Sequence, residues 1–222
     1  MSIMVGATSG KFVMVAAMLL FHARVDGDPV SAAIVPGAPV SKLSARLARQ
    51  VHRHGLPDLP VKIGIRGEYF YAPIAAADDE TPPKADIVIG QDLLADHPIE
   101  LDFRRHELAS LLPGEFSART RRDHAVTLTR EGPGQWRVEL TFPGGAAIDA
   151  LLDLTSPDAI ILGADAGGAV SSSTAAVTLG QARLPGVAIR QAGAGRSRVG
   201  LGVFAGRRVI LDLAHDRIWV DV

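Results

Sequence analysis

The sequence predicts an all-β protein of two similar lobes, and three observations lead to this prediction. Residues 27–38 resemble residues 145–156, and a shift of 118 residues places one segment on the other without a gap. The apolar, glycine-containing segment 89–94 has a counterpart at 199–204. Short apolar runs separated by Gly and Pro turns fill most of the remaining chain, which is typical of all-β proteins. Two features in the same order in each half indicate an internal duplication.

In the first half, residues 12–25 predict one or two strands, and Asp26-Gly27-Asp28 predicts the hairpin turn that follows them. The next run, 30–35, returns as a strand. Residues 41–54 predict a helix, because apolar side chains recur at helical spacing between a capping serine, Ser41, and a terminating glycine, Gly55. A hairpin is expected around Arg66-Gly67, between the runs 61–65 and 68–74.

The polar segment 113–123 contains Pro, Gly and several arginines, so we expect it to be a solvated linker. It divides the chain into an N-terminal lobe of residues 1–112 and a C-terminal lobe of residues 124–222. In the second lobe the apolar runs predict six strands, at 125–130, 136–142, 147–153, 159–162, 175–179 and 209–213.

The two repeated segments also resemble those of a known superfamily. Residues 89–94 read Ile-Gly-Gln-Asp-Leu-Leu and are followed by a strand-like run at 99–103. Over roughly 24–108 and 137–220 the chain is similar to the pepsin and retropepsin superfamily of aspartic proteases. The resemblance implies a two-lobed pepsin/retropepsin-like acid-protease fold, with short helices beginning near Gln91 and Leu201.

The resemblance also exposes a difference at the catalytic positions. Each lobe of the family carries Asp-Thr-Gly, whereas this chain has Val35-Pro36-Gly37 in one lobe and Asp153-Leu154-Thr155 in the other. Aspartic proteolysis needs two carboxylates that share one proton. The resemblance therefore implies one candidate catalytic residue, Asp153, whose partner position is occupied by Val35. Asp26, Asp28 and Asp158 are better explained by the turns that contain them.

Four further residues are candidates for contacting a substrate in the cleft: Gly37, Tyr69, Tyr71 and Thr155. The two tyrosines crowd the hairpin that lies where the family carries its flap. Aromatic side chains there would cover a bound peptide, or alternate members of the strand would simply pack inward.

These observations leave three functions open. The first is an aspartic-protease-like protein that is catalytically inactive and binds an extended peptide or protein segment between its lobes. The second is an active aspartic endopeptidase with an unrecognised second carboxylate. The third is a structural scaffold whose cleft is filled by its own side chains.

Composition restricts the remaining possibilities. The formal charge of −1 gives no electrostatic basis for binding nucleic acid. The chain has no cysteine, and its histidines are scattered, so we expect neither a metal nor another cofactor. The apolar run at 12–21 is too short to span a membrane. It is either a buried strand, which favours a cytoplasmic protein, or the core of a secretory signal, which favours a periplasmic or secreted one. The oligomeric state is left open.

Overall fold

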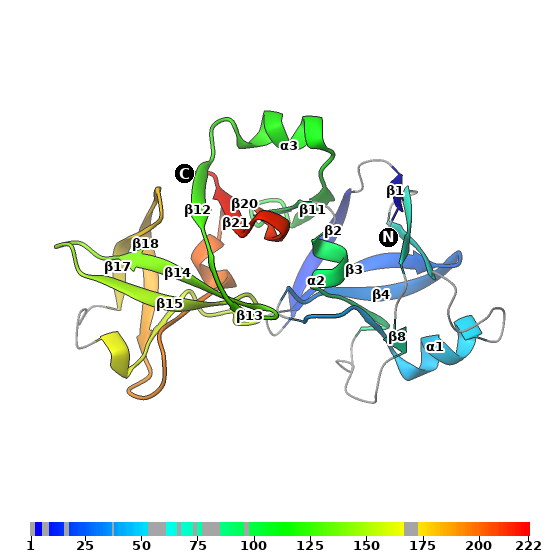
Figure 1. Cartoon of the computed structure of the whole chain (residues 1–222), viewed down its shortest axis with the longest axis horizontal. Coiled ribbons are helices and arrows are strands. Elements are labelled where there is room, and N and C mark those ends of the chain that lie inside the picture. The colour runs from blue at the N-terminus through cyan, green and yellow to red at the C-terminus, as the bar shows by residue number, and fades with distance from the viewer. Residues whose placement is uncertain are drawn as a thin grey trace.

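The computed structural model describes residues 3–5, 9–15, 18–36, 38–52, 61–65, 68–72, 75–76, 85–95, 98–166 and 173–222. Strands dominate throughout, and the helices are short. The prediction of an all-β fold with two lobes is confirmed. In Figure 1 the blue strands of the first half lie to the right and the barrel strands of the second half lie to the left.

The described residues of the first half form eleven strands and two helices. In chain order they are β1 (Ile3–Val5), β2 (Ser9–Val15), β3 (Met18–Val25), β4 (Asp28–Ile34), β5 (Lys42–Leu43), α1 (Ala45–His52), β6 (Val61–Ile65), β7 (Glu68–Ala72), β8 (Ala75–Ala76), β9 (Ile87–Ile89), α2 (Gln91–Leu94), β10 (Ile99–Asp102) and β11 (Glu107–Ser110). The helix α3 (Pro113–Thr120) then leads into the second half.

The second half forms a closed barrel and then returns to the first half. Its elements are β12 (His124–Thr127), β13 (Thr129–Gly132), β14 (Gln135–Thr141), β15 (Ala147–Asp153), β16 (Ile160–Leu162), η1 (Ala164–Ala166), β17 (Thr174–Leu179), β18 (Ala182–Gln191), β19 (Arg198–Gly200), η2 (Leu201–Phe204), β20 (Arg208–Asp212), η3 (Leu213–His215) and β21 (Arg217–Val220). Pairing of β14 with both β15 and β17 closes the barrel.

Each lobe contains the same three-stranded arrangement. In the first lobe β9 runs parallel to β4 and antiparallel to β5. In the second lobe β19 runs parallel to β15 and antiparallel to β16. This arrangement places the loop after β4 and the loop after β15 in equivalent positions, and these loops carry the altered triplets.

A shared antiparallel sheet joins the lobes. Its strand order is β12-β21-β20-β10-β11-β2, and its central pair joins β10 of the first half to β20 of the second. Leu101 pairs with Val209 at the middle of this contact, and both side chains are fully buried. In Figure 1 α3 lies above β20 and β21, at the top of the molecule.

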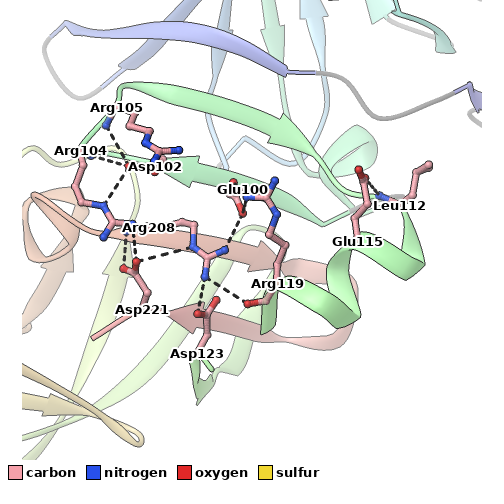
Figure 2. A network of polar contacts seen from close by, with 10 residues as sticks. All are labelled: Glu100, Asp102, Arg104, Arg105, Leu112, Glu115, Arg119, Asp123, Arg208 and Asp221. Atoms are coloured by element: carbon pink, nitrogen blue, oxygen red, sulfur yellow. Dashed lines mark hydrogen bonds and ion pairs between the residues drawn. The ribbon is translucent and has the colours of Figure 1, made fainter. Parts of the chain in front are cut away.

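A network of ion pairs covers one side of this shared sheet (Figure 2). Arg208 of β20 contacts Glu100 of β10 at 3.2 Å and Asp123 at 2.6 Å. Arg119 of α3 also pairs with Glu100, at 2.8 Å. The network therefore ties the first lobe, the connecting helix and the second lobe together.

The predicted linker 113–123 contains the helix α3, and Glu115 accepts a hydrogen bond from the Leu112 amide at the start of that helix. Two details of the sequence prediction are corrected. The predicted helix 41–54 starts later, at Ala45, and Ser44 instead of Ser41 accepts from the Leu47 amide. Gly55 lies outside the described residues.

The strands of the second half also differ from the prediction. The run 125–130 is two strands, β12 and β13, and β18, β19 and β21 were missed. Pro185 and Gly186 concealed β18, since both residues are unusual inside a strand. The predicted turn at Asp26-Gly27 is present, with positive φ at both residues. Among the described residues no helix has the length and apolar character needed to cross a membrane.

Candidate functional site between the lobes

The candidate site begins where β4 and β15 end. The Val35 amide donates to the carbonyl of Ile89, which extends the β4–β9 pairing by one residue. In the second lobe Asp153 is the last residue of β15 and pairs with Gly200 of β19. Val35 and Asp153 thus occupy equivalent places in their lobes, as the sequence shift predicts.

The loops that follow have matching backbone hydrogen bonds. The Ala38 amide donates to the Val35 carbonyl at 2.8 Å, and the Ser156 amide donates to the Asp153 carbonyl at 3.0 Å. The amides of Gln91 and Leu201 then donate to Ala38 and Ser156, both at 2.8 Å. The loops after β4 and β15 therefore share these two backbone hydrogen bonds, although their side chains differ.

Two glycines allow these loops to approach the helices that follow. A Cβ on Gly90 would lie 2.7 Å from the carbonyl oxygen of Ala38, and a Cβ on Gly200 would lie 2.3 Å from that of Asp158. Real side chains do not reach such distances from backbone atoms. The short helices begin directly after these glycines, at Gln91 and Leu201, as the resemblance implies.

A cavity of about 420 Å³ opens between the two loops. Its lining comes from both lobes: Val35, Ala38, Gly134, Gln135, Trp136, Leu151, Leu152, Asp153, Leu154, Thr155 and Arg198. Cavities of this size are typical of sites that bind small molecules or peptide side chains. The lobes therefore do not seal against each other at the position of the altered triplets.

Asp153 is held by its own loop. Its Oδ1 accepts from the Thr155 amide at 3.1 Å and from the Thr155 hydroxyl at 2.6 Å. Its Oδ2 lies 3.9 Å from Nη1 of Arg198, and about a quarter of the side chain is exposed to the cavity and solvent. The carboxylate therefore has one oxygen fixed by hydrogen bonds and one oxygen available.

The described part of this site contains no carboxylate dyad. Among the described residues that line the cavity, Asp153 carries the only carboxylate, and Val35 supplies an isopropyl group at the equivalent position. Asp28 lies at the opposite end of β4 from Val35 and accepts from Gln50, while Asp158 pairs with Arg190 at 2.7 Å. Neither residue lines the cavity.

Sequence reasoning missed Arg198 and Trp136. Trp136 forms part of the cavity wall and donates from Nε1 to Asp216, while its ring is almost wholly buried. Arg198 lies next to Leu151 in the register of β19 with β15. The signal for Arg198 was present, because the same shift that matches Gly90 with Gly200 matches it with Val88.

The remaining predicted site residues are placed only in part. Thr155 lines the cavity, as expected of a substrate-contacting candidate, but Gly37 lies outside the described residues. Tyr69 and Tyr71 belong to β7, which pairs with β6 and β1, and their side chains are not among those described. The proposed flap therefore stays a prediction.

Burial and hydrogen bonding shift the pKa values of two acidic groups, Asp216 and Glu131. Burial alone would raise the pKa of Asp216, but hydrogen bonds from Trp136 and Arg130 outweigh it and hold that pKa below its ordinary value of 3.8. The hydrogen bonds from Arg196 likewise hold the pKa of Glu131 below its ordinary value. Among the described residues no group of three or more His, Asp or Glu side chains is placed to hold a metal ion.

No protein-family model and no curated protein matches this sequence. A solved structure does match: the crystal structure of basic 7S globulin from soybean aligns with a TM-score of 0.61 and 10% sequence identity. The alignment covers 98% of this chain and 96% of the globulin chain. The globulin has a pepsin-like fold, and the likeness extends through both lobes. This chain has a pepsin-like fold.

Proposed function

We propose that this chain is a non-catalytic member of the pepsin-like fold that binds an extended peptide between its lobes. The observation that carries the proposal is the cavity at the altered triplets, which combines an open volume with a single carboxylate. An open cavity supports binding, and the unpaired carboxylate argues against hydrolysis.

The chemistry of peptide hydrolysis explains why one carboxylate is insufficient. One acid must take a proton from the attacking water while the other donates a proton to the substrate carbonyl, and each contribution is worth roughly 10² to 10⁴ in rate. The isopropyl side chain of Val35 can neither take a proton nor donate one. One oxygen of Asp153 accepts a hydrogen bond from Thr155, and the other lies near the guanidinium of Arg198. The carboxylate is therefore better placed to bind a ligand than to exchange protons with it.

An extended peptide is the ligand that best suits a cavity between two sets of strands. Such a peptide pairs its backbone with nearby strand ends and loops and places alternate side chains into pockets. The apolar side chains of Val35, Leu152 and Leu154, which come from both lobes, suit an apolar side chain of the peptide, and Asp153 and Gln135 suit backbone amides. Gly37, Tyr69 and Tyr71 remain candidates for additional contacts.

The two rival functions are less well supported. A scaffold with a filled cleft is difficult to reconcile with about 420 Å³ of open volume. An active endopeptidase needs a second acid, which the described lining does not supply.

The repeated loop geometry also supports an internal duplication. Val35 with Ala38 and Asp153 with Ser156 make the same backbone hydrogen bond in the two lobes. We place the boundary between lobes 1–112 and 124–222 at the segment 113–123, which contains α3. Equivalent loops that diverge only in side chains are what an ancestral lobe, copied and then altered, would leave.

A peptide-library digest tests the loss of catalysis. We expect no cleavage by the wild-type chain at acid or neutral pH. Cleavage that is present in the wild type and disappears in Asp153→Asn would establish an active protease and overturn the proposal.

A binding experiment tests the peptide function separately. A defined pool of short acetylated, amidated peptides is equilibrated with the protein, and bound members are identified by mass spectrometry. Ala38→Phe, which fills the cavity, should abolish binding. Leu112→Phe, at the exposed start of α3, should leave it unchanged. Binding that survives in Ala38→Phe would place the peptide elsewhere and contradict the proposal.

A further inference from the structure

The two walls of the cavity differ in polarity although their backbones match. Val88 pairs with Ala33 in the first lobe as Arg198 pairs with Leu151 in the second. Val88 is buried, and Val35 packs against the cluster to which it belongs. Arg198 instead projects a half-exposed guanidinium at the cavity. One wall is therefore apolar, and the other places a cation beside Asp153.

The guanidinium of Arg198 has unused donors. The ion pair of Arg198 with Asp153 spans 3.9 Å, which is longer than a hydrogen bond, and no acceptor among the described residues lies closer. Two other arginines of this lobe have closer carboxylate partners: Arg196 donates twice to Glu131 at 3.0 Å, and Arg137 lies 3.0 Å from Glu131. Arg198 is thus the cation of this wall that can accept a new partner.

Arg198 lacks a close hydrogen-bond acceptor, and a planar anion would supply one. A guanidinium binds a carboxylate through two parallel N–H···O bonds, and such charge-assisted pairs are stronger than neutral hydrogen bonds. Asp153 does not prevent this, because one arginine can serve several carboxylates. Arg208 does so in this same chain, where it contacts both Glu100 and Asp123.

Resting on the proposed peptide function, we propose that the cavity selects a peptide that carries a carboxylate next to an apolar side chain. The carboxylate binds the guanidinium of Arg198, and the apolar side chain lies against Val35 and Leu154. The free Oδ2 of Asp153 accepts an amide proton of the peptide. The carboxylate belongs either to an acidic side chain or to the C-terminus of the peptide, and the two sources are separated experimentally.

Isothermal titration with three probes tests the proposal. The probes are acetyl-Leu-Leu with a free carboxylate, the same peptide as its C-terminal amide, and acetyl-Leu-Leu-Glu as its amide. We expect at least one carboxylate probe to bind about ten-fold to one-hundred-fold more tightly than the neutral amide, as expected for charge-assisted hydrogen bonds. Whichever carboxylate probe binds more tightly identifies the source.

Variants of Arg198 test whether this side chain causes the preference for a carboxylate. Arg198→Gln should remove it, and Arg198→Lys should retain only part of it, because lysine lacks the planar pair of donors. Arg183→Gln serves as the matched control, since Arg183 is an exposed arginine of the same barrel outside the cavity lining. Thermal melting checks that each variant is folded.

Two results would overturn the inference. The first is equal affinity for the acid and amide probes, and the second is a preference that persists in Arg198→Gln. If the neutral amide binds as tightly as the acids and Ala38→Phe abolishes that binding, the peptide function stands and the carboxylate preference fails. If no probe binds and the peptide pool also gives no ligand, both proposals fail.

Discussion

Arg208 and Asp123 form a buried ion pair of 2.6 Å at the sheet that joins the lobes. The side chain of Asp123 is only 2% exposed and that of Arg208 is 15% exposed. The two residues lie far apart in the sequence, on β20 and just before β12. Arg208 also reaches Glu100 and, at 3.9 Å, Asp221, so one guanidinium serves three carboxylates (Figure 2).

Removing this guanidinium should destabilise the whole chain. Arg208→Met leaves the buried carboxylates of Glu100 and Asp123 without their shared cation, and breaking a buried pair in this way costs about 3–5 kcal/mol. Chemical denaturation should show this loss in the free energy of unfolding. Arg217→Met is the control, because Arg217 lies exposed on the neighbouring strand β21 and should change stability little. An Arg208→Met variant as stable as the control would show that the network contributes no net stability.

The fold could be predicted from the sequence because its signals are local and repeated. The glycines at 90 and 200, and the apolar runs that precede them, have fixed spacing in each half. The network around Arg208 could not be predicted, since its members come from five separate segments and no local pattern links them. The sequence shift aligns Arg198 with Val88, but only the fold shows that Arg198 lies beside Asp153.

Asp216 should make the stability depend on pH. Because its pKa in the folded chain lies below the ordinary value of 3.8, its contribution is present above that value and is lost as the pH falls toward the folded pKa. Wild type should therefore exceed Asp216→Asn in unfolding free energy at neutral pH, and the difference should shrink on acidification below about pH 4. A difference that does not change with pH would contradict this assignment.

The contribution of Asp123 to stability should change with pH in the opposite direction. Burial raises its pKa despite the ion pair with Arg208, and its Oδ2 has no hydrogen-bond partner. A raised pKa means that the folded chain binds the proton more tightly than the unfolded chain does. Relative to Asp123→Asn, wild type should therefore gain stability as the pH falls from the folded pKa to about 3.8. Denaturation of wild type, Asp216→Asn and Asp123→Asn across one pH series gives the change of each stability difference with pH. If the two differences change with pH in the same direction, the opposite pKa shifts assigned to Asp216 and Asp123 are contradicted.

Restoring the missing acid should not restore hydrolysis. Val35→Asp places a second carboxylate at the cavity, but Thr155 still holds Oδ1 of Asp153, and Arg198 remains nearby to neutralise either acid. We expect the digest of a peptide library to stay unchanged. Addition of Arg198→Val, which copies Val88, and Thr155→Gly, which copies Gly37, removes both obstacles. Turnover by Val35→Asp alone would show that the loops already have a productive geometry.

Gly90 and Gly200 should both tolerate substitution poorly. Their backbones pass so close to Ala38 and Asp158 that a methyl group would meet carbonyl oxygens at 2.7 and 2.3 Å. These are backbone atoms, so no side chain can rotate away and the loops must move. We expect Gly90→Ala and Gly200→Ala each to lower the free energy of unfolding by about 3 kcal/mol.

Gly114→Ala is the matched control, because a Cβ there meets nothing within 4 Å and α3 should gain up to about 1 kcal/mol from the better helix former. Since the same loops line the cavity, both glycine variants should also weaken peptide binding, whereas Gly114→Ala should not. Glycine variants that melt and bind like the control would show that the two loops do not depend on this close approach.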